Sequence, residues 1–317
     1  MNKTVAFLWW EGEVQWENAD QPFSKDWKSQ DYAEYMEMLA EKDIRVVCGD
    51  YTWYRDESMQ KAWHWNGEEW RKVEKVELDG VYDLFRHDKG KYELKKEMKE
   101  DVGILNDPEV AELCQDKLKT FERFEEYIPE TRKASEKNVE EMIEKYGKVI
   151  VKPRYGSSGE GISVVEDVSE FEVPEDWDEM IVQKIMENLG TDELGVEGPH
   201  DLRVIVVNDE VIGSYLRIPE EGELLSNVAQ GGSKKYVDLD DVPKEALSIV
   251  EEVASELDDY RPVIYTVDVM FSDGEPMIVE LNSQPGIYYH GPGRKESREK
   301  PWMKKVVEAI GELAESS

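Results

Sequence analysis

The sequence predicts an α/β domain at the N-terminus, followed by parts of α+β character. Two apolar, strand-like runs at 5–9 and 44–48 flank a helical pattern over 28–42, and this order is typical of a parallel α/β unit. After residue 108 the strand-like runs come in pairs joined by short turns, as in antiparallel hairpins. Hydrophobic residues form 39% of the 317 positions, which is enough for the cores of two or three compact units.

The other N-terminal elements are a hairpin and one more strand. Residues 63–65 and 70–73 are strand-like, and Asn66-Gly67 between them favours a type I′ turn, which needs two positive φ angles. The next strand is expected at 81–85. Most of the ten tryptophans lie in this part of the chain, and we expect them to serve core and hairpin packing rather than a ligand-binding aromatic surface.

Helices and strands alternate in the rest of the chain. Asp107 and Pro108 form a good helix start, as N-cap and first-turn residue, and this helix is expected to continue towards Tyr127. Further helices are expected at 135–147, 243–257 and 301–314, and further strands at 149–153, 162–165, 180–183, 202–207 and 210–218. The predicted domains are 1–107, 108–187 with a linker helix and a glycine loop, and 188–317 with a metal site.

The composition favours an acidic cytoplasmic protein. Asp and Glu number 73 against 39 Lys and Arg, which gives a net charge of −34, and the acidic residues are spread along the chain. This pattern indicates a solvated, halophile-like acidic surface suited to a salt-rich cytoplasm. A duplex nucleic-acid partner is disfavoured, because no basic stripe is available to neutralise phosphates.

The cysteines and the apolar runs also favour a cytoplasmic protein. Cys48 and Cys114 lie far apart in apolar segments, so we expect free buried thiols in a reducing cytosol. Zinc is not expected, since the chain has no CxxC motif and only four histidines. We also expect no signal peptide and no membrane span, because no apolar stretch approaches 18 residues.

The most informative functional feature is a predicted hairpin that carries two carboxylates and an amide. Its strands are expected at 263–271 and 276–282, and side chains alternate across a strand, so Glu280 and Asn282 share one face. With Asp268 on the same face, the three side chains provide hard oxygen ligands of the kind that Mg²⁺ takes in nucleotide sites. Acidic residues are so abundant that, on this pattern alone, a chance meeting of two acids is an equal alternative.

The face on which Asp268 lies depends on the loop of this hairpin. A three-residue loop at 272–274 places Asp268 opposite Ile278, diagonal to Glu280 and on the same face. A loop shorter by one residue places Asp268 opposite Val279, on the other face. The metal interpretation therefore predicts the three-residue loop.

A glycine loop with a preceding lysine is the second functional feature. Lys152 ends a predicted strand, and the loop 156–161 carries three glycines and two serines. Glycine lets the backbone approach a phosphate closely, and successive N–H groups form an anion-binding concavity. The GxxxxGK[ST] spacing of a Walker A loop and the dinucleotide fingerprint are both absent, and a plain hairpin turn is an equal alternative.

The order of these parts resembles the ATP-grasp superfamily, most closely ligases of the ribosomal-protein S6 glutamate ligase and glutathione synthetase type. The resemblance covers residues 108–315. It is carried by Lys152-Pro153, the loop 156–161, residues 182–185, Asp201-Leu202-Arg203, Arg217, Ser226-Asn227, Gly231-Gly232, Asp268 and residues 280–286. It implies an ATP-grasp fold, in which two lobes clamp ATP behind an N-terminal α/β domain.

The resemblance also implies an ATP site. The residues that it assigns to ATP are Lys117, Lys152, Gly156, Ser157, Ser158, Gly159, Gly161, Gln183, Lys184, Ile185 and Asp201. Lys117 and Lys152 correspond to the phosphate-contacting lysines, and 183–185 correspond to the hinge that reads adenine. The family often has Glu where this chain has Lys184, but the hinge reads adenine through its backbone.

The metal and catalytic residues follow from the same resemblance. It assigns Asp268, Glu280 and Asn282 to two Mg²⁺ ions, with Mn²⁺ as an alternative metal. The residues that it places near the γ-phosphate are Arg203, Arg217 and Asn227.

The resemblance implies an ATP-dependent carboxylate–amine ligase that acts through an acyl phosphate on small-molecule or peptide substrates. Two alternatives are an ATP-grasp phosphotransferase and a non-catalytic ATP-binding regulatory protein. We hypothesise that Arg86 and His87, at the end of a predicted strand, and Tyr288 and His290, after the metal strand, line the substrate pocket. An exposed loop histidine is an equal alternative for His290.

Overall fold

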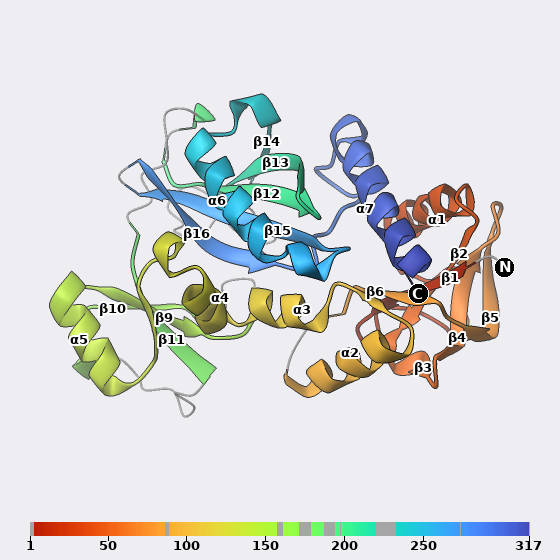
Figure 1. Cartoon of the computed structure of the whole chain (residues 1–317), viewed down its shortest axis with the longest axis horizontal. Helices are drawn as coiled ribbons and strands as arrows, with labels where there is room; N and C mark the ends of the chain where they lie inside the picture. Colours follow the sequence, from red (N-terminus) through yellow and green to blue (C-terminus); the bar gives the residue numbers. More distant parts are fainter. Residues whose placement is uncertain are drawn as a thin grey trace. The chain divides into compact units, whose positions relative to one another are not determined.

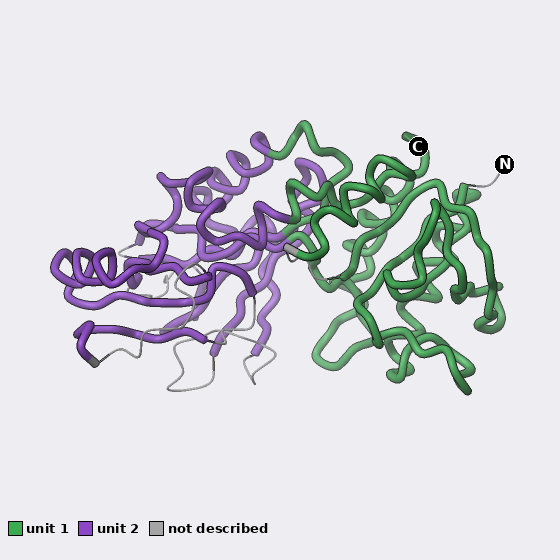
Figure 2. The backbone as a smooth tube through the Cα atoms, turned by 90° about the horizontal axis from the view of Figure 1, so that it is seen from below, with its two compact units in different colours: residues 1–111, 257–265, 283–317 green, residues 112–256, 266–282 purple. Residues whose placement is uncertain are grey.

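The chain forms two compact units, each built from segments that are far apart in the sequence (Figure 2). The computed structural model describes residues 3–85, 89–156, 161–170, 179–186, 194–196, 198–219, 233–272 and 274–316. Unit 1 comprises residues 1–111, 257–265 and 283–317, and unit 2 comprises residues 112–256 and 266–282. The three domains expected from the sequence, with boundaries after residues 107 and 187, stay a prediction.

Unit 1 is a mixed seven-stranded sheet with helices (Figure 1). Its strands are β1 (Lys3–Trp9), β2 (Ile44–Asp50), β3 (Tyr54–Arg55), β4 (Ser58–Trp65), β5 (Trp70–Glu77), β6 (Gly80–Asp83) and β7 (Ile104–Leu105). Its helices are α1 (Asp26–Ala40), α2 (Lys89–Asp101) and α7 (Glu296–Ser316), and α3 (Pro108–Gln115) leads into unit 2. The strand order is β3-β4-β2-β1-β6-β7, with β5 paired to β4, and β1 runs parallel to both β2 and β6. The predicted parallel α/β unit is therefore confirmed.

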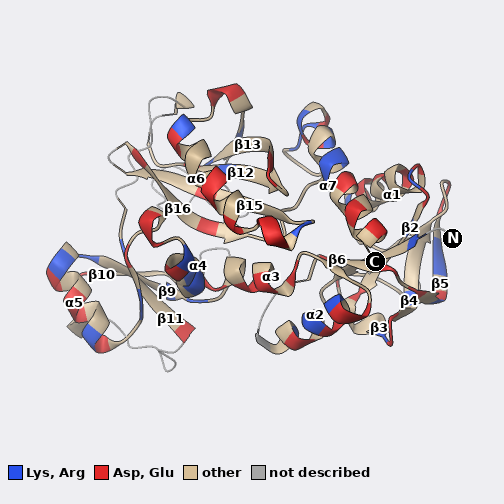
Figure 3. Ribbon diagram, viewed as in Figure 1, with Lys and Arg blue, Asp and Glu red and all other residues tan. Residues whose placement is uncertain are grey.

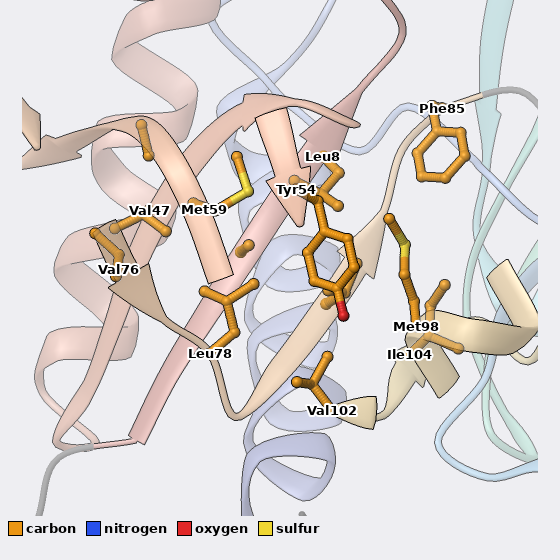
Figure 4. Packing of buried hydrophobic residues seen from close by; sticks show 13 residues of the cluster. Leu8, Val47, Tyr54, Met59, Val76, Leu78, Phe85, Met98, Val102 and Ile104 are labelled. Atoms are coloured by element: carbon orange, nitrogen blue, oxygen red, sulfur yellow. The ribbon is translucent and has the colours of Figure 1, made fainter. Parts of the chain in front are cut away.

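The core of unit 1 lies between the sheet and the helices. Figure 4 shows Leu8 of β1, Val47 of β2, Met59 of β4 and Met98 of α2 in one cluster of buried side chains. The expectation that the N-terminal tryptophans pack into the core holds for those in strands such as Trp63, which is 1% exposed. Burial of such a side chain stabilises the fold by about 1.5–3 kcal/mol.

The hairpin of β4 and β5 forms as expected, but its turn does not. Trp65 pairs with Trp70, so the loop holds four residues, and the expectation of a two-residue type I′ turn is wrong. Asn66 instead uses its side-chain Oδ1 to accept the backbone N–H groups of Glu68 and Glu69, at 3.0 and 2.9 Å. Asparagine side chains commonly replace a backbone turn in this way.

Unit 2 contains two antiparallel sheets (Figure 1). The smaller sheet has the order β10-β9-β11-β8, and the larger has the order β14-β13-β12-β15-β16. The strands are β8 (Thr131–Lys133), β9 (Val149–Pro153), β10 (Ser163–Val165), β11 (Met180–Lys184), β12 (Asp201–Val207), β13 (Glu210–Ile218), β14 (Ser233–Val237), β15 (Ile264–Ser272) and β16 (Glu275–Asn282). The helices are α4 (Lys117–Arg123), α5 (Glu136–Tyr146) and α6 (Lys244–Glu256). Helix α5 contacts β9 and β11 of the smaller sheet, and α6 contacts β16 of the larger.

The single helix expected from Pro108 to Tyr127 is divided. Asp116 interrupts it with extended backbone, and its carboxylate accepts the N–H groups of Leu118 and Lys119 as the N-cap of α4. An Asp side chain at this position satisfies donors that the new helix leaves open, so the break is stabilised locally. As a result, Lys117 becomes the first residue of α4.

In the ribbon of Figure 3, Asp and Glu residues are distributed over elements of both units, with Lys and Arg residues between them. Both cysteines are free and buried, as expected. Among the described helices, none combines the length and the apolar character that crossing a bilayer would require.

Candidate active site

The hairpin of β15 and β16 places its polar side chains on one face, although its register differs from the expected one. Asp268 pairs directly with Glu280, and Thr266 pairs with Asn282. Ser272 pairs with Glu275, so the expectation of a three-residue loop at 272–274 is wrong.

A β-bulge accounts for the difference. The register shifts next to Asp268, where Val269 pairs with Ile278 while Asp268 pairs with Glu280, so Val279 is the extra residue on β16. One extra residue on a strand reverses the alternation of the side chains that follow. The bulge therefore restores the face that the shorter loop would have lost.

Two arginines bind the buried carboxylate of Asp268. Arg203 on β12 donates to both carboxylate oxygens, at 2.7 and 2.6 Å, and Arg217 on β13 donates to Oδ2 at 2.6 Å. Arg217 also binds Asp201, at 2.6 Å. The Asp268 side chain is fully buried, and burial alone would raise its pKa, but the two guanidiniums outweigh burial and lower it. Asp268 therefore stays ionised.

The side chains on this face fit a divalent cation. Asn282 turns Nδ2 towards Asp268 Oδ2 and Thr266 Oγ1, at 3.4 Å each, which leaves its amide oxygen for a ligand. Asp268 Oδ1 accepts a bond from Arg203, and a carboxylate oxygen has room for a second partner. Among the described residues no three His, Cys, Asp or Glu side chains gather into a metal site, and the third oxygen ligand of this set is the amide of Asn282.

Two lysines lie beside Glu280 in the same unit. Lys117 Nζ donates to the carbonyl oxygen of Gly156 at 2.6 Å and lies 4.0 Å from Glu280 Oε1. Lys152 on β9 donates to Gln183 Oε1 at 2.8 Å. One pocket brings these groups together, and it is lined by Cys114, Lys117, Thr120, Ile128, Lys152, Gln183, Val279, Glu280 and Leu281.

Burial changes the acidity of both lysines. Together, burial and the positive charge of Lys117 lower the pKa of Lys152 to about 8, although the negative charge of Glu280 opposes them. Burial also lowers the pKa of Lys117, while the negative charge of Glu280 raises it. A bound polyanion would stabilise the protonated forms of both lysines and so raise their pKa values.

The sequence did not predict the groups that fix Lys117. Asp116 is fully buried and binds Arg154 through both carboxylate oxygens, at 2.6 and 2.5 Å, and it also accepts a bond from Tyr155 at 3.0 Å. The backbone N–H of Lys117 donates to the carbonyl oxygen of Arg154 at 3.1 Å. The signal was present, because an Asp directly before Lys117 is a good N-cap and Arg154 follows Lys152 by two residues.

The glycine loop and the hinge are described in part. Gly156 and Gly161 have positive φ angles of 109° and 72°, which glycine adopts readily. Lys184 ends β11 and uses its backbone N–H to bind the carbonyl oxygen of Glu130, at 2.9 Å. Ile185 directly follows β11. The predicted residues Ser157, Ser158, Gly159, Asn227, Arg86 and His87 lie outside the described residues.

The two described residues of the expected substrate pocket lie in unit 1. Tyr288 stacks on Trp27 of α1, with ring centroids 5.0 Å apart. His290 Nδ1 lies 3.0 Å from Oδ1 of Asp31, which is fully buried. Both residues are thus fixed by α1.

Comparison with known proteins places the chain in a family. The RimK-like ATP-grasp domain matches residues 121–291, which is more than half of the chain. The chain belongs to the RimK-like ATP-grasp family. The resemblance seen in the sequence is thereby confirmed.

Relatives and solved structures agree with this RimK-like assignment. The glutamate–LysW ligase ArgX of Sulfurisphaera tokodaii is 28% identical over 158 residues, which are 47% of this chain and 56% of the relative. A probable alpha-L-glutamate ligase of Ectopseudomonas mendocina is 27% identical over 192 residues, 59% of this chain and 61% of the relative. The chain thus spans less than two thirds of the length of these curated relatives.

Solved structures confirm the ATP-grasp fold. D-alanyl-alanine synthetase A from Vibrio cholerae has a TM-score of 0.63 at 14% identity, covering 100% of both chains. A RimK domain protein from Sphaerobacter thermophilus has a TM-score of 0.60 at 14% identity, covering 98% of both chains.

Proposed function

We propose that this RimK-like ATP-grasp chain is an ATP-dependent carboxylate–amine ligase that acts through an acyl phosphate. The observation that carries the proposal is the direct pairing of Asp268 with Glu280 on one face of the hairpin, with Lys117 and Lys152 in the pocket beside Glu280. The relatives are named as ligases, which agrees with this activity.

ATP would bind with its phosphates at this cationic pocket. Lys117 and Lys152 would bind phosphate oxygens, and the backbone of Gly156, Ser157, Ser158, Gly159 and Gly161 would approach the phosphates closely. The hinge at Gln183, Lys184 and Ile185 would read adenine. Asp201 would support the site by holding Arg217 in place.

Mg²⁺ would be held by Asp268, Glu280 and Asn282, in two ions with Mn²⁺ as a substitute, and would neutralise the charge that develops on the transferred phosphoryl group. Arg203, Arg217 and Asn227 would add to this neutralisation. Phosphoryl transfer depends mainly on positioning and on neutralising charge, and the arginines are already fixed through Asp268.

The chemistry has two steps. A carboxylate oxygen of the first substrate attacks the γ-phosphorus of ATP, the bond to ADP breaks, and an acyl phosphate forms. The amine of the second substrate then attacks the carbonyl carbon, and phosphate leaves with the electron pair. Small molecules or peptides in the cytoplasm would supply the carboxylate and the amine, and Arg86, His87, Tyr288 and His290 would contact them. The acidic surface would suit a salt-rich cytoplasm and disfavours nucleic acid.

A screen of amino acids and short peptides for ADP release tests this function, followed by mass measurement of the product. A ligase gives ADP, free phosphate and an amide. A phosphorylated product with no free phosphate would favour a phosphotransferase instead. ATP binding without ADP release from any substrate pair would favour a regulatory protein.

A further inference from the structure

One face of the smaller sheet of unit 2 carries three polar side chains. Thr131 on β8 pairs directly with Gln183 on β11, and Lys152 on β9 pairs with the residue two positions before Gln183. Because residues two positions apart share a face of a strand, Thr131, Gln183 and Lys152 lie on the same face. The opposite face carries Val151, which is buried in the core with α5. Lys152 and Gln183 line the pocket of the candidate active site, so the polar face borders that pocket.

Hydrogen bonds join these side chains into one network, which consists of Lys152, Gln183, Thr131 and Pro129. Lys152 Nζ donates to Gln183 Oε1 at 2.8 Å, and Gln183 Nε2 donates to Thr131 Oγ1 at 2.7 Å. Thr131 Oγ1 donates to the carbonyl oxygen of Pro129 at 2.8 Å. All four residues belong to unit 2, so the network lies within one compact unit.

The direction of each hydrogen bond in this network is determined from its two ends. An ammonium can only donate, and a backbone carbonyl oxygen can only accept. The hydroxyl of Thr131 has one hydrogen, which it gives to Pro129, so it must accept from Gln183. The amide of Gln183 therefore turns its NH₂ group to Thr131 and its oxygen to Lys152. A backbone carbonyl thus sets the orientation of an amide that contacts the ammonium.

The ammonium of Lys152 depends on this amide oxygen. Lys152 is 8% exposed and Thr131 is 3% exposed. Burying a charged group without a hydrogen-bond partner costs free energy. Within the described residues, the ammonium donates to Gln183 alone. An ammonium has three N–H donors, so Gln183 uses one and leaves two for a ligand.

Lys117 gives a second reason for holding Lys152 in place. The two lysines line the same pocket, and the positive charge of Lys117 acts against the protonated form of Lys152. Like charges repel, so this repulsion would favour an ammonium turned away from the pocket. The amide oxygen of Gln183 opposes that movement without cancelling the positive charge. A carboxylate in the same place would hold Lys152 but would also repel phosphates.

We propose that Gln183 and Thr131 are positioning residues, which hold the ammonium of Lys152 in the pocket for the phosphates of ATP. This inference rests on the function proposed above. It gives the side chain of Gln183 a task of its own, because the hinge would read adenine through its backbone. It also adds Thr131, which no motif in the sequence indicates.

The test compares two substitutions of Thr131. Thr131→Val has nearly the same shape but no hydroxyl, so Gln183 Nε2 loses its acceptor and the amide is no longer oriented. Thr131→Ser keeps the hydroxyl. We expect the Kd for ATP, measured by calorimetry, to rise about tenfold in Thr131→Val and to stay within about twofold of the wild type in Thr131→Ser. Thr4→Val is the control, because Thr4 is also a buried strand residue but lies in unit 1.

Inorganic triphosphate separates the lysine from the adenine hinge. It has no base, so its Kd should rise by the same factor as the Kd for ATP in Thr131→Val and should not change in Thr4→Val. Triphosphate binding that is unchanged while ATP binding weakens would place the effect at the hinge and overturn the inference. Thr131→Val with a Kd for ATP within about twofold of the wild type would also overturn it. Equal weakening in Thr131→Ser and Thr131→Val would do the same, since the hydroxyl would then not matter.

A double-mutant cycle tests whether the effect passes through Lys152. In a Lys152→Met background, Thr131→Val should cause no further loss of ATP affinity, because the group that the network holds is gone. Losses that add would show that Thr131 acts on the fold rather than on Lys152, and would overturn the inference. A wild type that binds neither ATP nor triphosphate would instead contradict the proposed function itself.

Discussion

Two buried aspartates, Asp268 in unit 2 and Asp83 in unit 1, have pKa values shifted in opposite directions. Burial acts to raise the pKa of both. Around Asp268 the two guanidiniums outweigh it and the pKa falls, whereas Asp83 has the ammonium of Lys95, which is itself fully buried, and its pKa rises. The number and geometry of the cations, rather than the depth of burial, decide the direction in which the pKa of each carboxylate shifts.

A third aspartate follows the same rule. Asp116 is fully buried, yet two bonds from Arg154 and two backbone N–H groups lower its pKa against the effect of burial. Asp116 and Asp268 both support the proposed active site. Asp83, in contrast, accepts a bond from Gln284 at 3.2 Å and holds the end of β6 to the segment after β16.

The largest effect is expected from Asp268→Asn. The neutral amide leaves Arg203 and Arg217 without their common anion, so ADP formation should fall by about 10²–10³, as when one electrostatic group of an active site is removed. Glu275→Gln is the matched control, because Glu275 is an exposed acid on the same hairpin. ADP release measures both variants, and turnover above a tenth of wild type in Asp268→Asn would contradict the proposed role.

Lys95→Met should have the next largest effect, on stability. It leaves Asp83 buried and unpaired, and breaking a buried ion pair costs about 3–5 kcal/mol in the free energy of unfolding. The double variant with Asp83→Asn should recover most of this loss. Urea unfolding measures both.

The pH dependence of Lys95→Met has a defined sign. The folded pKa of Asp83 is raised, so the folded state binds more protons than the unfolded state, and stability falls as pH rises through that pKa. The deficit of Lys95→Met should therefore be smaller at acidic pH. An equal deficit at all pH values would show that Asp83 is not the cause.

Asp116→Asn should have a smaller effect on stability and a separate effect on ATP. It loses the charged partner of Arg154 and weakens the N-cap, which together amount to about 2 kcal/mol. Because Lys117 begins the helix that Asp116 caps, the Kd for ATP should also rise. Calorimetry measures the affinity, and Ser135→Ala, which removes the N-cap of α5, is a control that should destabilise without this rise.

The smallest expected effect is a pH dependence of the Kd for ATP that arises from Lys152. Its pKa of about 8 means that the free pocket loses this positive charge as pH rises through about 8, so the Kd for ATP should rise by at most about tenfold per pH unit. The fold itself responds in the opposite direction. Because the folded pKa of Lys152 is below its unfolded value, the unfolded state binds more protons between the two pKa values, so the free energy of unfolding rises with pH in that range.

Lys152→Arg should remove this pH dependence, since arginine stays charged. Lys119→Arg, on α4 with an exposed ammonium, is its control. A Kd for ATP in the wild type that is constant from pH 7 to about 9 would contradict the assignment.

Patterns with a strong local cause were predictable from the sequence. The period of apolar residues predicted the parallel β1–α1–β2 unit. Helix α5 begins after Ser135 and ends before Gly147, as expected. Asp268, Glu280 and Asn282 were predicted to share a face, and they do.

What the sequence could not predict depends on tertiary contacts. A bulge at Val279 and a shorter loop nearly cancel in their effect on side-chain direction, so the right face was reached through the wrong register. The N-cap of Asp116 is local, but its ion pair with Arg154 joins residues 38 positions apart, and no local pattern predicts that pairing.

The nesting of the two units also bears on how the protein is made. Helix α7 contacts β1, β6 and β7 of unit 1, yet it comes after all of unit 2 in the chain. A ribosome that adds residues from the N-terminus therefore releases the strands of unit 1 long before the helix that packs on them. During that interval the apolar side chains under α7 are a natural binding surface for a chaperone, and unit 2 has the opportunity to fold first.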